Sequence, residues 1–358
     1  MKRVKNMDIT VTWLVNNINQ LGGIEQVICG LTNHFINEFG YTVKILSTNT
    51  DKTNTVFPLD QKAEVFHYNQ DWRTSTTHST SKLIKNILLN LETDILITCH
   101  PDISNHVVIH MRHLKGKHII TEHSSPACYT KKRMVLNSLF FRFADVLVNL
   151  TEHSRSTYRR YLCDSVVIPN AIFLQDISRS SLDSKIVVAA GRLEEIKGYD
   201  RLLTAFSIAT KNHPEWKLYI CGDGSCAEKL KAQAKELNIN ERVFFPGNVK
   251  MNEFYAKASI FALSSHFESF SLALVEAHSY GLPAVTFDIP CVKEVTNGNG
   301  VLIAPQDDVH MFAEHLETLF ESNETMLKLS DEAYFQSKNF TITAIGEKWK
   351  ALFENLLS

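Results

Sequence analysis

The sequence predicts an α/β protein built from two doubly wound domains, each a parallel sheet covered by helices. Short β-branched segments alternate with amphipathic helical segments almost from end to end, which is the pattern of βα units. This pattern stops at a polar stretch, Gln175–Ser184, and then begins again. The chain has 358 residues, enough for two domains of roughly 100–200 residues each.

The first half is expected to begin with a strand at Asp8–Val15. Apolar residues then recur at helical spacing from Ile24 to Phe39, and the helix is expected to end at Gly40. Glycine is typical at this position because it adopts the left-handed conformation that ends many helices. Further strands of this half are expected at 42–47, 63–67, 94–99, 117–121, 145–149 and 165–168.

The second half repeats the alternation. Helices are expected to begin near Gly198, Ser225, Asn252 and Phe270, and the last segment keeps a helical stripe from Ile345 to Leu356. Strands are expected at 185–190, 216–221, 243–245, 259–263 and 283–287. Two domains of this kind would bind a ligand in a central cleft that the carboxyl ends of their strands face.

Composition excludes several classes of protein. The formal net charge is −2, so there is no basic field to indicate a nucleic-acid partner. No apolar run reaches the roughly 18 residues of a membrane span, and the apolar segment near the N-terminus is too short for a signal peptide. Seven cysteines without a CxxC pair favour reduced thiols, and hence a cytoplasmic protein, over disulfides or a zinc site.

A pair of glycines, Gly22 and Gly23, lies between the first strand and the first helix. Glycine permits close approach of a ligand to the backbone, and the helix that follows offers free N–H groups to a phosphate. A plain tight turn is the alternative. The segment lacks the GxGxxG spacing, which argues against a nicotinamide-dependent oxidoreductase.

A second motif, from Gly191 to Gly198, follows a strand and opens a helix. It holds Arg192 and Lys197 on either side of a turn, where a guanidinium fork and an ammonium would together clamp a diphosphate. The alternative is a surface loop whose cations are solvated beside the neighbouring glutamates.

The third motif is the most specific. Glu268 lies in the loop Ser264–Ser269, after a strand and before a helix expected to start near Phe270 or Ser271. Glu276 lies in an apolar segment of that helix, so its carboxylate must be buried with partners. Ribose and hexose hydroxyls would fit this requirement, and an internal pair with Arg or Lys is the alternative.

The order and spacing of these motifs resemble the family-4 retaining glycosyltransferases of the GT-B fold (glycosyl transferases group 1), over nearly the whole chain. Several short segments add to the resemblance, namely 168–170, 221–224, 245–249, 280–283 and 294–303. The resemblance implies an acceptor-side domain at 1–175 and a donor-binding domain at 185–340. It also implies that the last helix, at about 341–358, packs back on the first domain.

The resemblance also implies roles for single residues. Gly22 and Gly23 would approach the donor phosphates, and Arg192 and Lys197 would hold the diphosphate. Glu268 would bind donor-sugar hydroxyls and Glu276 the ribose. The remaining implied positions are the phosphate-binding backbone at Ser269, Phe270 and Ser271, the base-reading backbone at Val249, and His123 beside the sugar and acceptor.

Two of these assignments have qualifications in the sequence. His100 also follows a strand and is the alternative to His123. The family often has Gly or Pro where this chain has Ser269 and Ser271. The segment Asp288–Val292 replaces the family's glycine-rich loop, so the identity of the donor sugar stays open.

The implied reaction moves a hexose-type sugar from a nucleoside-diphosphate sugar to a glycan or lipid-linked acceptor, with retention, in cell-surface polysaccharide biosynthesis. UDP is the default nucleotide and GDP the alternative. No metal or other cofactor is expected, because Arg192, Lys197 and helix N-termini supply the positive charge. The alternatives are a GT-B nucleotide-sugar epimerase or phosphorylase, and a non-catalytic nucleotide- or sugar-binding protein.

The acceptor side is less specified. Lys131–Arg133 precede a segment rich in large apolar residues up to Phe143, and Arg155, Arg159 and Arg160 lie nearby in the sequence. Such a surface would make peripheral contact with anionic lipid on the inner face of the cytoplasmic membrane. The alternative is an ordinary helix that buries its apolar face in the core.

Overall fold

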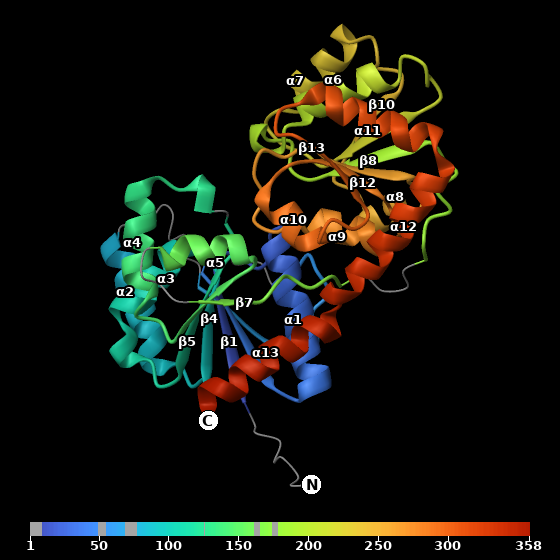
Figure 1. Cartoon of the computed structure of the whole chain (residues 1–358). Coiled ribbons are helices and arrows are strands. Elements are labelled where there is room, and N and C mark those ends of the chain that lie inside the picture. The colour runs from blue at the N-terminus through green and yellow to red at the C-terminus, as the bar shows by residue number, and fades with distance from the viewer. Residues whose placement is uncertain (1–8, 49–54, 69–76, 125, 161–164, 174–177) are drawn as a thin grey trace. The chain divides into compact units, whose positions relative to one another are not determined.

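The computed structural model describes residues 9–48, 55–68, 77–124, 126–160, 165–173 and 178–358, and its chain divides into two compact units (Figure 1). Unit 1 comprises residues 1–173 and 340–358, and unit 2 comprises 174–339. Each unit is a parallel sheet with helices on both faces. The predicted α/β class with two Rossmann-like domains is therefore confirmed.

Unit 1 contains a seven-stranded sheet in the order β3-β2-β1-β4-β5-β6-β7. Strand order reverses between β1 and β4, which are hydrogen-bonded neighbours. Ligands of doubly wound sheets bind at such switch points, beyond the carboxyl ends of the strands. The strands are Thr10–Val15, Thr42–Ser47, Glu64–His67, Ile95–Thr98, Lys117–Glu122, Val146–Asn149 and Val166–Val167.

The first helix of unit 1, α1 (Gly23–Phe39), ends at Gly40, whose φ of 69° is the left-handed conformation expected there. The other helices are α2 (Thr77–Asn90), α3 (Pro101–Ile109), α4 (Lys131–Phe141), α5 (Glu152–Arg159) and α13 (Ile342–Leu357), with short 3₁₀ turns at Met111–His113 and Pro126–Cys128.

The C-terminal helix α13 packs against α1 in unit 1. Trp349 lies edge-on to Trp13 of β1, with ring centroids 6.1 Å apart, and Phe353 lies edge-on to Phe35 of α1 at 5.4 Å. Offset and edge-to-face aromatic pairs of this kind stabilise a contact beyond the area they bury. This cluster holds the last helix on the first unit.

Unit 2 contains a six-stranded sheet in the order β10-β9-β8-β11-β12-β13. Numbered from its own first strand, this is the 3-2-1-4-5-6 order of the Rossmann fold, with the switch point between β8 and β11. The strands are Ile186–Ala190, Lys217–Cys221, Val243–Gly247, Ile260–Leu263, Ala284–Phe287 and Val301–Ala304.

The helices of unit 2 cover both faces of this sheet (Figure 1). They are α6 (Tyr199–Ala209), α7 (Ala227–Glu236), α8 (Met251–Tyr255), α9 (Leu272–Ser279), α10 (Pro290–Thr296), α11 (Val309–Glu321) and α12 (Asn323–Ser337), with 3₁₀ turns at Glu195–Lys197 and Lys338–Phe340. Among the described helices, none combines the length and apolar composition needed to cross a membrane.

The expected linker Gln175–Ser184 is anchored where the structure describes it; residues 175–177 lie outside the described part. Leu182 is buried, and its carbonyl accepts a hydrogen bond from Ser259 Oγ at 2.6 Å. Ser180 Oγ donates to the Ala258 carbonyl at 2.5 Å. The second half of this stretch therefore belongs to the packed body of unit 2.

Two local interpretations need correction. The segment expected as a loop at Asp288–Val292 is helical from Pro290, because Pro290 starts α10, a position where proline's missing N–H costs nothing. Strand β13 was not expected. It is an edge strand of only four residues between glycine-rich and polar segments, which gives little periodic signal.

Candidate active site

The second and third motifs meet at the switch point of unit 2. The motif around Lys197 follows β8, and the motif around Glu268 follows β11, the parallel neighbour of β8. Because carboxyl ends of neighbouring parallel strands lie at one sheet edge, residues far apart in sequence come together there. This edge holds most of the predicted donor-binding residues.

Lys197 and Glu268 are in direct contact. Lys197 Nζ lies 2.6 Å from Glu268 Oε1, and Ser265 Oγ donates to the same oxygen at 2.7 Å. The two loops are joined by the backbone as well: His266 N donates to the Ile196 carbonyl at 2.8 Å, and Ser264 Oγ donates to the Lys197 carbonyl at 2.9 Å. The ammonium is thereby fixed in position before any ligand arrives.

Two glycines permit this close approach. Gly191 has φ of 149°, and a Cβ there would lie 3.3 Å from Lys197 Cε and 3.0 Å from Tyr199 Oη. Gly198 has φ of 59°, and a Cβ there would collide with the Ser264 carbonyl. The backbone conformation favours glycine at both positions, and at Gly198 a side chain would also have no space.

The helix that follows Glu268, α9, begins at Leu272, one or two residues later than expected. Its N-cap is Ser271, with φ of 64° and ψ of 73°, and the side chain makes no capping hydrogen bond. Ser271 Oγ is buried and has no partner among the described residues. The first N–H groups of α9 are thus uncapped by this hydroxyl, as a phosphate site at a helix N-terminus requires.

Glu276 is buried on α9, as the apolar surroundings predicted. Tyr255 Oη, at the end of α8, donates to Glu276 Oε2 at 3.3 Å. Burial, followed by the charge of Glu276, raises the pKa of the Tyr255 hydroxyl well above its usual range, so it stays a hydrogen-bond donor. The sequence did not indicate Tyr255; only its burial in the fold brings it to Glu276. This partner of the carboxylate is a neutral hydroxyl, like the ribose hydroxyls that the motif predicted.

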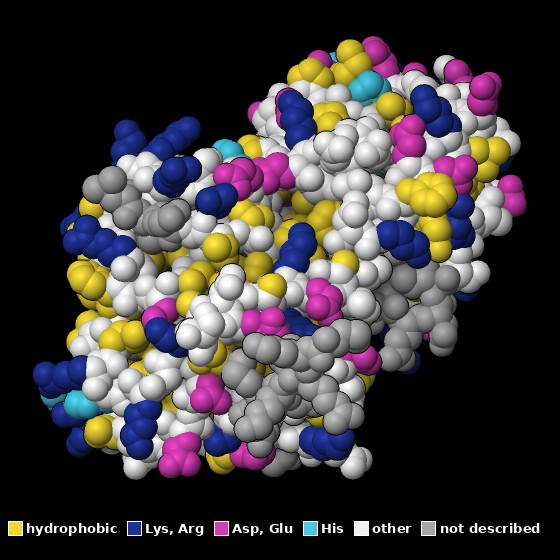
Figure 2. Space-filling model, turned by 60° about the horizontal axis from the view of Figure 1, so that its bottom comes forward, with side chains coloured by type: hydrophobic (Ala, Val, Ile, Leu, Met, Phe, Trp, Pro, Cys, Tyr) yellow, Lys and Arg dark blue, Asp and Glu magenta, His cyan; other side chains and the backbone are white. Residues whose placement is uncertain are grey.

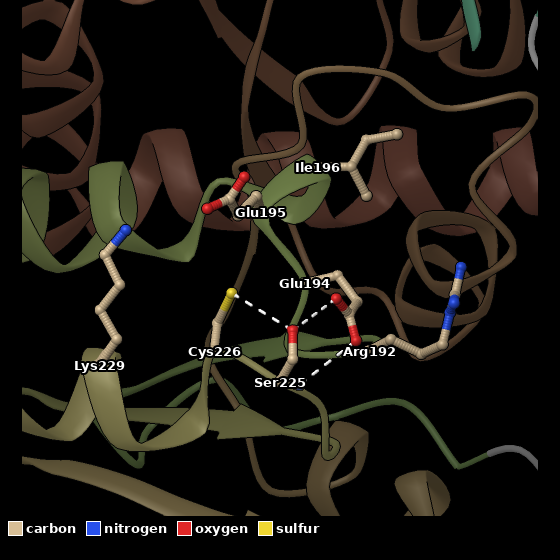
Figure 3. A pocket seen from close by; sticks show the side chains of 7 residues that line it. All are labelled: Arg192, Glu194, Glu195, Ile196, Ser225, Cys226 and Lys229. Atoms are coloured by element: carbon tan, nitrogen blue, oxygen red, sulfur yellow. Dashed lines mark hydrogen bonds between the residues drawn. The ribbon is translucent and has the colours of Figure 1, made fainter.

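Arg192 is exposed and lies beside an open hollow of about 590 Å³. In this hollow, Ser225 donates to both carboxylate oxygens of Glu194, through Oγ at 2.8 Å and through its N–H at 3.3 Å. Figure 3 shows Ser225 between Glu194 and Cys226, with Arg192 and Lys229 at opposite sides. The Glu194–Ser225 contact ties the loop after β8 to the loop after β9, and it was not predicted. Neither Lys197 nor Glu268 lines this hollow.

Val249 lies just beyond β10, two strands from β8, and packs partly buried against the core of unit 2. The assignment of its backbone to base recognition stays a prediction.

In unit 1, the paired glycines lie at the start of α1, at the switch point of that sheet. Gly22 is the extended N-cap, and Gly23 is the first helical residue and is exposed. A Cβ at Gly22 would collide with Glu25 Oε2, so the buried Glu25 carboxylate folds back over the glycine. A carboxylate at this positive helix end is electrostatically favourable.

His123 follows β5, and its Nε2 lies 3.1 Å from Thr121 Oγ1. Burial, and then the nearby His100, lower the pKa of His123 to about 3, so the imidazole is neutral at pH 7. The two histidines weighed as alternatives are therefore neighbours. His100 is the N-cap of α3 and its carbonyl accepts from Ser104.

The residue before His123 was missed by the sequence interpretation. Glu122 is buried and accepts hydrogen bonds from Tyr158 Oη at 2.7 Å, Ser124 N at 2.8 Å and Tyr129 Oη at 3.3 Å. Burial raises its pKa, although these donors act in the opposite direction. It holds the loop that carries His123 against two other elements of unit 1.

Among the described residues, no group of three His, Cys, Asp or Glu side chains is arranged to hold a metal ion. The polar groups at the sheet edge of unit 2 are instead a fixed cation, two carboxylates and a helix N-terminus. These groups recognise sugar hydroxyls and phosphate oxygens.

The same fold occurs in known proteins. Over 355 residues, the chain is 28% identical to an uncharacterized glycosyltransferase of Haemophilus influenzae, which covers 96% of this chain and 99% of the relative. It is 25% identical to an α-1,4-N-acetyl-D-galactosaminyltransferase of Campylobacter jejuni that acts on a GalNAc- and diNAcBac-containing undecaprenol diphosphate, with coverage of 96% and 97%. HepE of Anabaena, solved with UDP and glucose, matches 97% of this chain and 100% of its own with a TM-score of 0.80 at 15% identity.

These matches and the two Rossmann-like units define a glycosyltransferase of the GT-B fold. Residues 172–336 match the family model described as glycosyl transferases group 1, which spans nearly all of unit 2 and the candidate site. Unit 2 therefore matches that group of glycosyltransferases, as the motifs around Lys197 and Glu268 predicted.

Proposed function

We propose that this enzyme transfers a hexose-type sugar from a UDP-sugar, with retention of the anomeric configuration, to a glycan or lipid-linked acceptor. The observation that carries the proposal is the Lys197–Glu268 pair at the switch point of unit 2, beside the N-terminus of α9. A fixed ammonium and a helix N-terminus suit a diphosphate, and a carboxylate beside them suits sugar hydroxyls.

In this proposal, Lys197 and Arg192 hold the diphosphate and stabilise its charge as the glycosidic bond breaks, so no divalent metal is needed. The backbone of Ser269, Phe270 and Ser271 meets a phosphate, Glu268 binds hydroxyls of the donor sugar, and Glu276 binds the ribose. In unit 1, His123 is neutral and acts as a hydrogen-bond partner of the sugar or acceptor.

On the same proposal, the enzyme takes part in cell-surface polysaccharide biosynthesis from the cytoplasmic side of the membrane. The undecaprenol diphosphate acceptor of the Campylobacter jejuni relative supports a lipid-linked acceptor. The UDP bound to HepE of Anabaena supports a uridine donor.

The test is a thermal-shift panel with UDP, GDP, ADP, NAD and orthophosphate, each with and without EDTA, on the wild type and on Glu276→Ala. A ligand at 100 times its Kd adds about 2.7 kcal/mol to the stability of the unit that binds it. We expect UDP to stabilise the wild type equally with EDTA, and to lose most of its effect in the variant.

A second assay separates transfer from binding. Release of UDP from UDP-hexose is measured with and without a polyprenyl-diphosphate-linked glycan, together with the anomeric configuration of the product. A protein that binds UDP but shows no release with any acceptor would be a nucleotide-binding protein, and interconversion of the free donor would identify an epimerase.

A further inference from the structure

Helix α4 of unit 1 exposes several large apolar side chains and buries two polar ones, unlike an ordinary amphipathic helix. Its buried residues are Met134, Asn137, Ser138 and Phe141, two of them polar. Its exposed residues include large apolar side chains: Val135 is 45% exposed, Leu136 42% and Leu139 45%, and Phe143 just beyond the helix is 61% exposed. The interpretation that this segment buries its apolar residues in the core is therefore wrong for these four.

The four exposed apolar side chains share one face. Val135, Leu139 and Phe143 are spaced by four residues, and Leu136 is three residues before Leu139. Residues three and four apart are neighbours on a helix surface, so Val135, Leu136 and Leu139 form one apolar strip, and the exposed Phe143 follows it just beyond the helix end. Isolated exposed apolar residues are ordinary, whereas a contiguous strip marks a contact surface.

Cations border this strip. Lys131 and Lys132 lie one turn before Val135 and Leu136, and Arg142 lies one turn after Leu139, with its guanidinium 5.3 Å from the Phe143 ring. Arg133 instead forms an ion pair with Asp102 of α3. Within the described part of the chain, Lys131, Lys132 and Arg142 have no carboxylate partner within 4 Å.

The helix itself contributes no acidic residue to this face. The segment from Lys131 to Phe143 contains no Asp or Glu, and the next acid, Asp145, pairs with Lys117 at 3.3 Å. Basic and apolar side chains lie side by side on the surface of unit 1 (Figure 2). The net charge of the whole chain is −2, so the basic character is local to this face.

We propose that the exposed face of α4, defined by Lys131, Lys132, Val135, Leu136, Leu139 and Phe143, docks on an anionic lipid bilayer. Apolar side chains flanked by cations fit the boundary between acyl chains and anionic headgroups, where the apolar groups insert and the cations meet phosphate. A protein partner would pair with this face through matching acids. An anionic bilayer offers such charge over its whole surface.

The inference deepens the proposed function, because it names the membrane surface at which a lipid-linked acceptor would be met. It does not depend on the donor: a chain that bound no UDP would still carry this face. The experiment is therefore a binding assay on vesicles, with the full chain and without substrates.

The protein is floated with two kinds of vesicle: phosphatidylcholine alone, and phosphatidylcholine with 30% phosphatidylglycerol as a test composition. Each is measured at about 0.05 and 0.5 M NaCl, below and above the physiological ionic strength. We expect at least about ten-fold more binding to the anionic vesicles, lost at high salt, as the attraction of three cations to an anionic surface implies. Leu136→Ser with Leu139→Ser, and separately Lys131→Ser with Lys132→Ser, should each reduce binding about ten-fold or more.

The chain offers a matched control. Leu327 and Phe335 of α12 in unit 2 are 50% and 69% exposed, and Leu327→Ser with Phe335→Ser removes comparable apolar surface elsewhere. This variant should bind vesicles as the wild type does. Circular dichroism and the thermal unfolding midpoint of each variant confirm that it is folded.

Three results would overturn the inference. One is equal binding of the wild type to neutral and anionic vesicles, or none to either. Another is an equal loss of binding in the α12 control. The third is sedimentation showing that the α4 variants convert a dimer to a monomer while vesicle binding is unchanged, which would make the face an interface between copies of the chain.

Discussion

Lys197 and Glu268 are 71 residues apart in the sequence and 2.6 Å apart in the fold, and their side chains are only 21% and 11% exposed. The ion pair joins the loop after β8 to the loop after β11, on the two strands that flank the switch point of unit 2. It holds a cation and a carboxylate at one sheet edge before any substrate binds. Catalytic groups held in this way need little rearrangement when charge develops.

The first prediction concerns this pair. Lys197→Ala should reduce kcat about a hundred- to a thousand-fold, because it removes a fixed positive charge from the leaving diphosphate. Glu268→Gln should cost about 1–2 kcal/mol of stability, since it leaves a half-buried ammonium with a neutral partner. Turnover with UDP-hexose and urea unfolding measure the two effects.

The double variant is the control for direct contact. Lys197→Ala with Glu268→Gln should lose less stability than the two single losses combined, with a coupling of about 0.5–3 kcal/mol. Strict additivity would show that the pair does not form in solution.

The second prediction concerns the buried carboxylate of α9. Glu276→Gln and Tyr255→Phe should both weaken UDP binding, the first by removing a charge from the ribose site and the second by freeing the carboxylate to turn. Tyr255→Phe should also cost about 1 kcal/mol of stability, through the lost hydrogen bond at 3.3 Å. Pyrophosphate, which has no ribose, should bind both variants as it binds the wild type. Titration calorimetry with UDP and pyrophosphate tests the assignment, and a parallel loss of both ligands would contradict it.

The third prediction concerns the start of α9. Ser271 has φ of 64° and a buried, unpartnered hydroxyl, so Ser271→Gly should raise the stability of unit 2 by about 0.5–1 kcal/mol. UDP binding should be retained, because the backbone N–H groups are unchanged. Asn238→Gly, with φ of 57° just after α7, should gain less, since asparagine tolerates this conformation well. A destabilised Ser271→Gly would show that the hydroxyl has a partner in solution.

The fold was accessible from the sequence because most strands of the parallel sheets are short, β-branched and bounded by turns. The strand expected at 42–47 has those bounds in the structure, and α1 ends at Gly40 as the glycine indicated. Strand β13 was not predicted. It is as short as β11 and β12, but it lies at the sheet edge and its two middle residues are only partly buried. The orientation of α4 could not be predicted, because the spacing of apolar residues shows only which of them share a face. The packed fold is needed to show which face is buried.

The site was accessible as a set of motifs but not as a set of contacts. Order along the chain indicated that Lys197 and Glu268 serve one ligand; only the neighbouring positions of β8 and β11 show that they touch. Tyr255, Glu194 and Glu122 were missed for the same reason. Each has a partner far away in the sequence, at 21 residues for Tyr255, 31 for Glu194 and 36 for Glu122, and no local pattern connects them.

The last prediction concerns acid stability. His118 in unit 1 and His278 in unit 2 are almost fully buried, and burial lowers the pKa of each to about 3. The unfolded chain takes up these protons near pH 6.5 and the folded chain does not, so stability is present above about pH 6.5 and falls as the pH falls toward 3. Each histidine should contribute a slope of about 1.4 kcal/mol per pH unit in that window.

Urea unfolding between pH 5 and 6.5 separates the histidines from carboxylates with lowered pKa, such as Glu194 and Asp60, which act only at lower pH. His278→Asn should flatten the pH dependence of unit 2 and leave that of unit 1 unchanged. His118→Asn should reduce the slope of unit 1 only in part, because burial also lowers the pKa of His123. If His278→Asn and the wild type show the same change of unfolding free energy with pH, the loss of stability at low pH does not come from His278. In that case His278 is charged in the folded chain, and a carboxylate must lie closer to it than the packing of α9 shows.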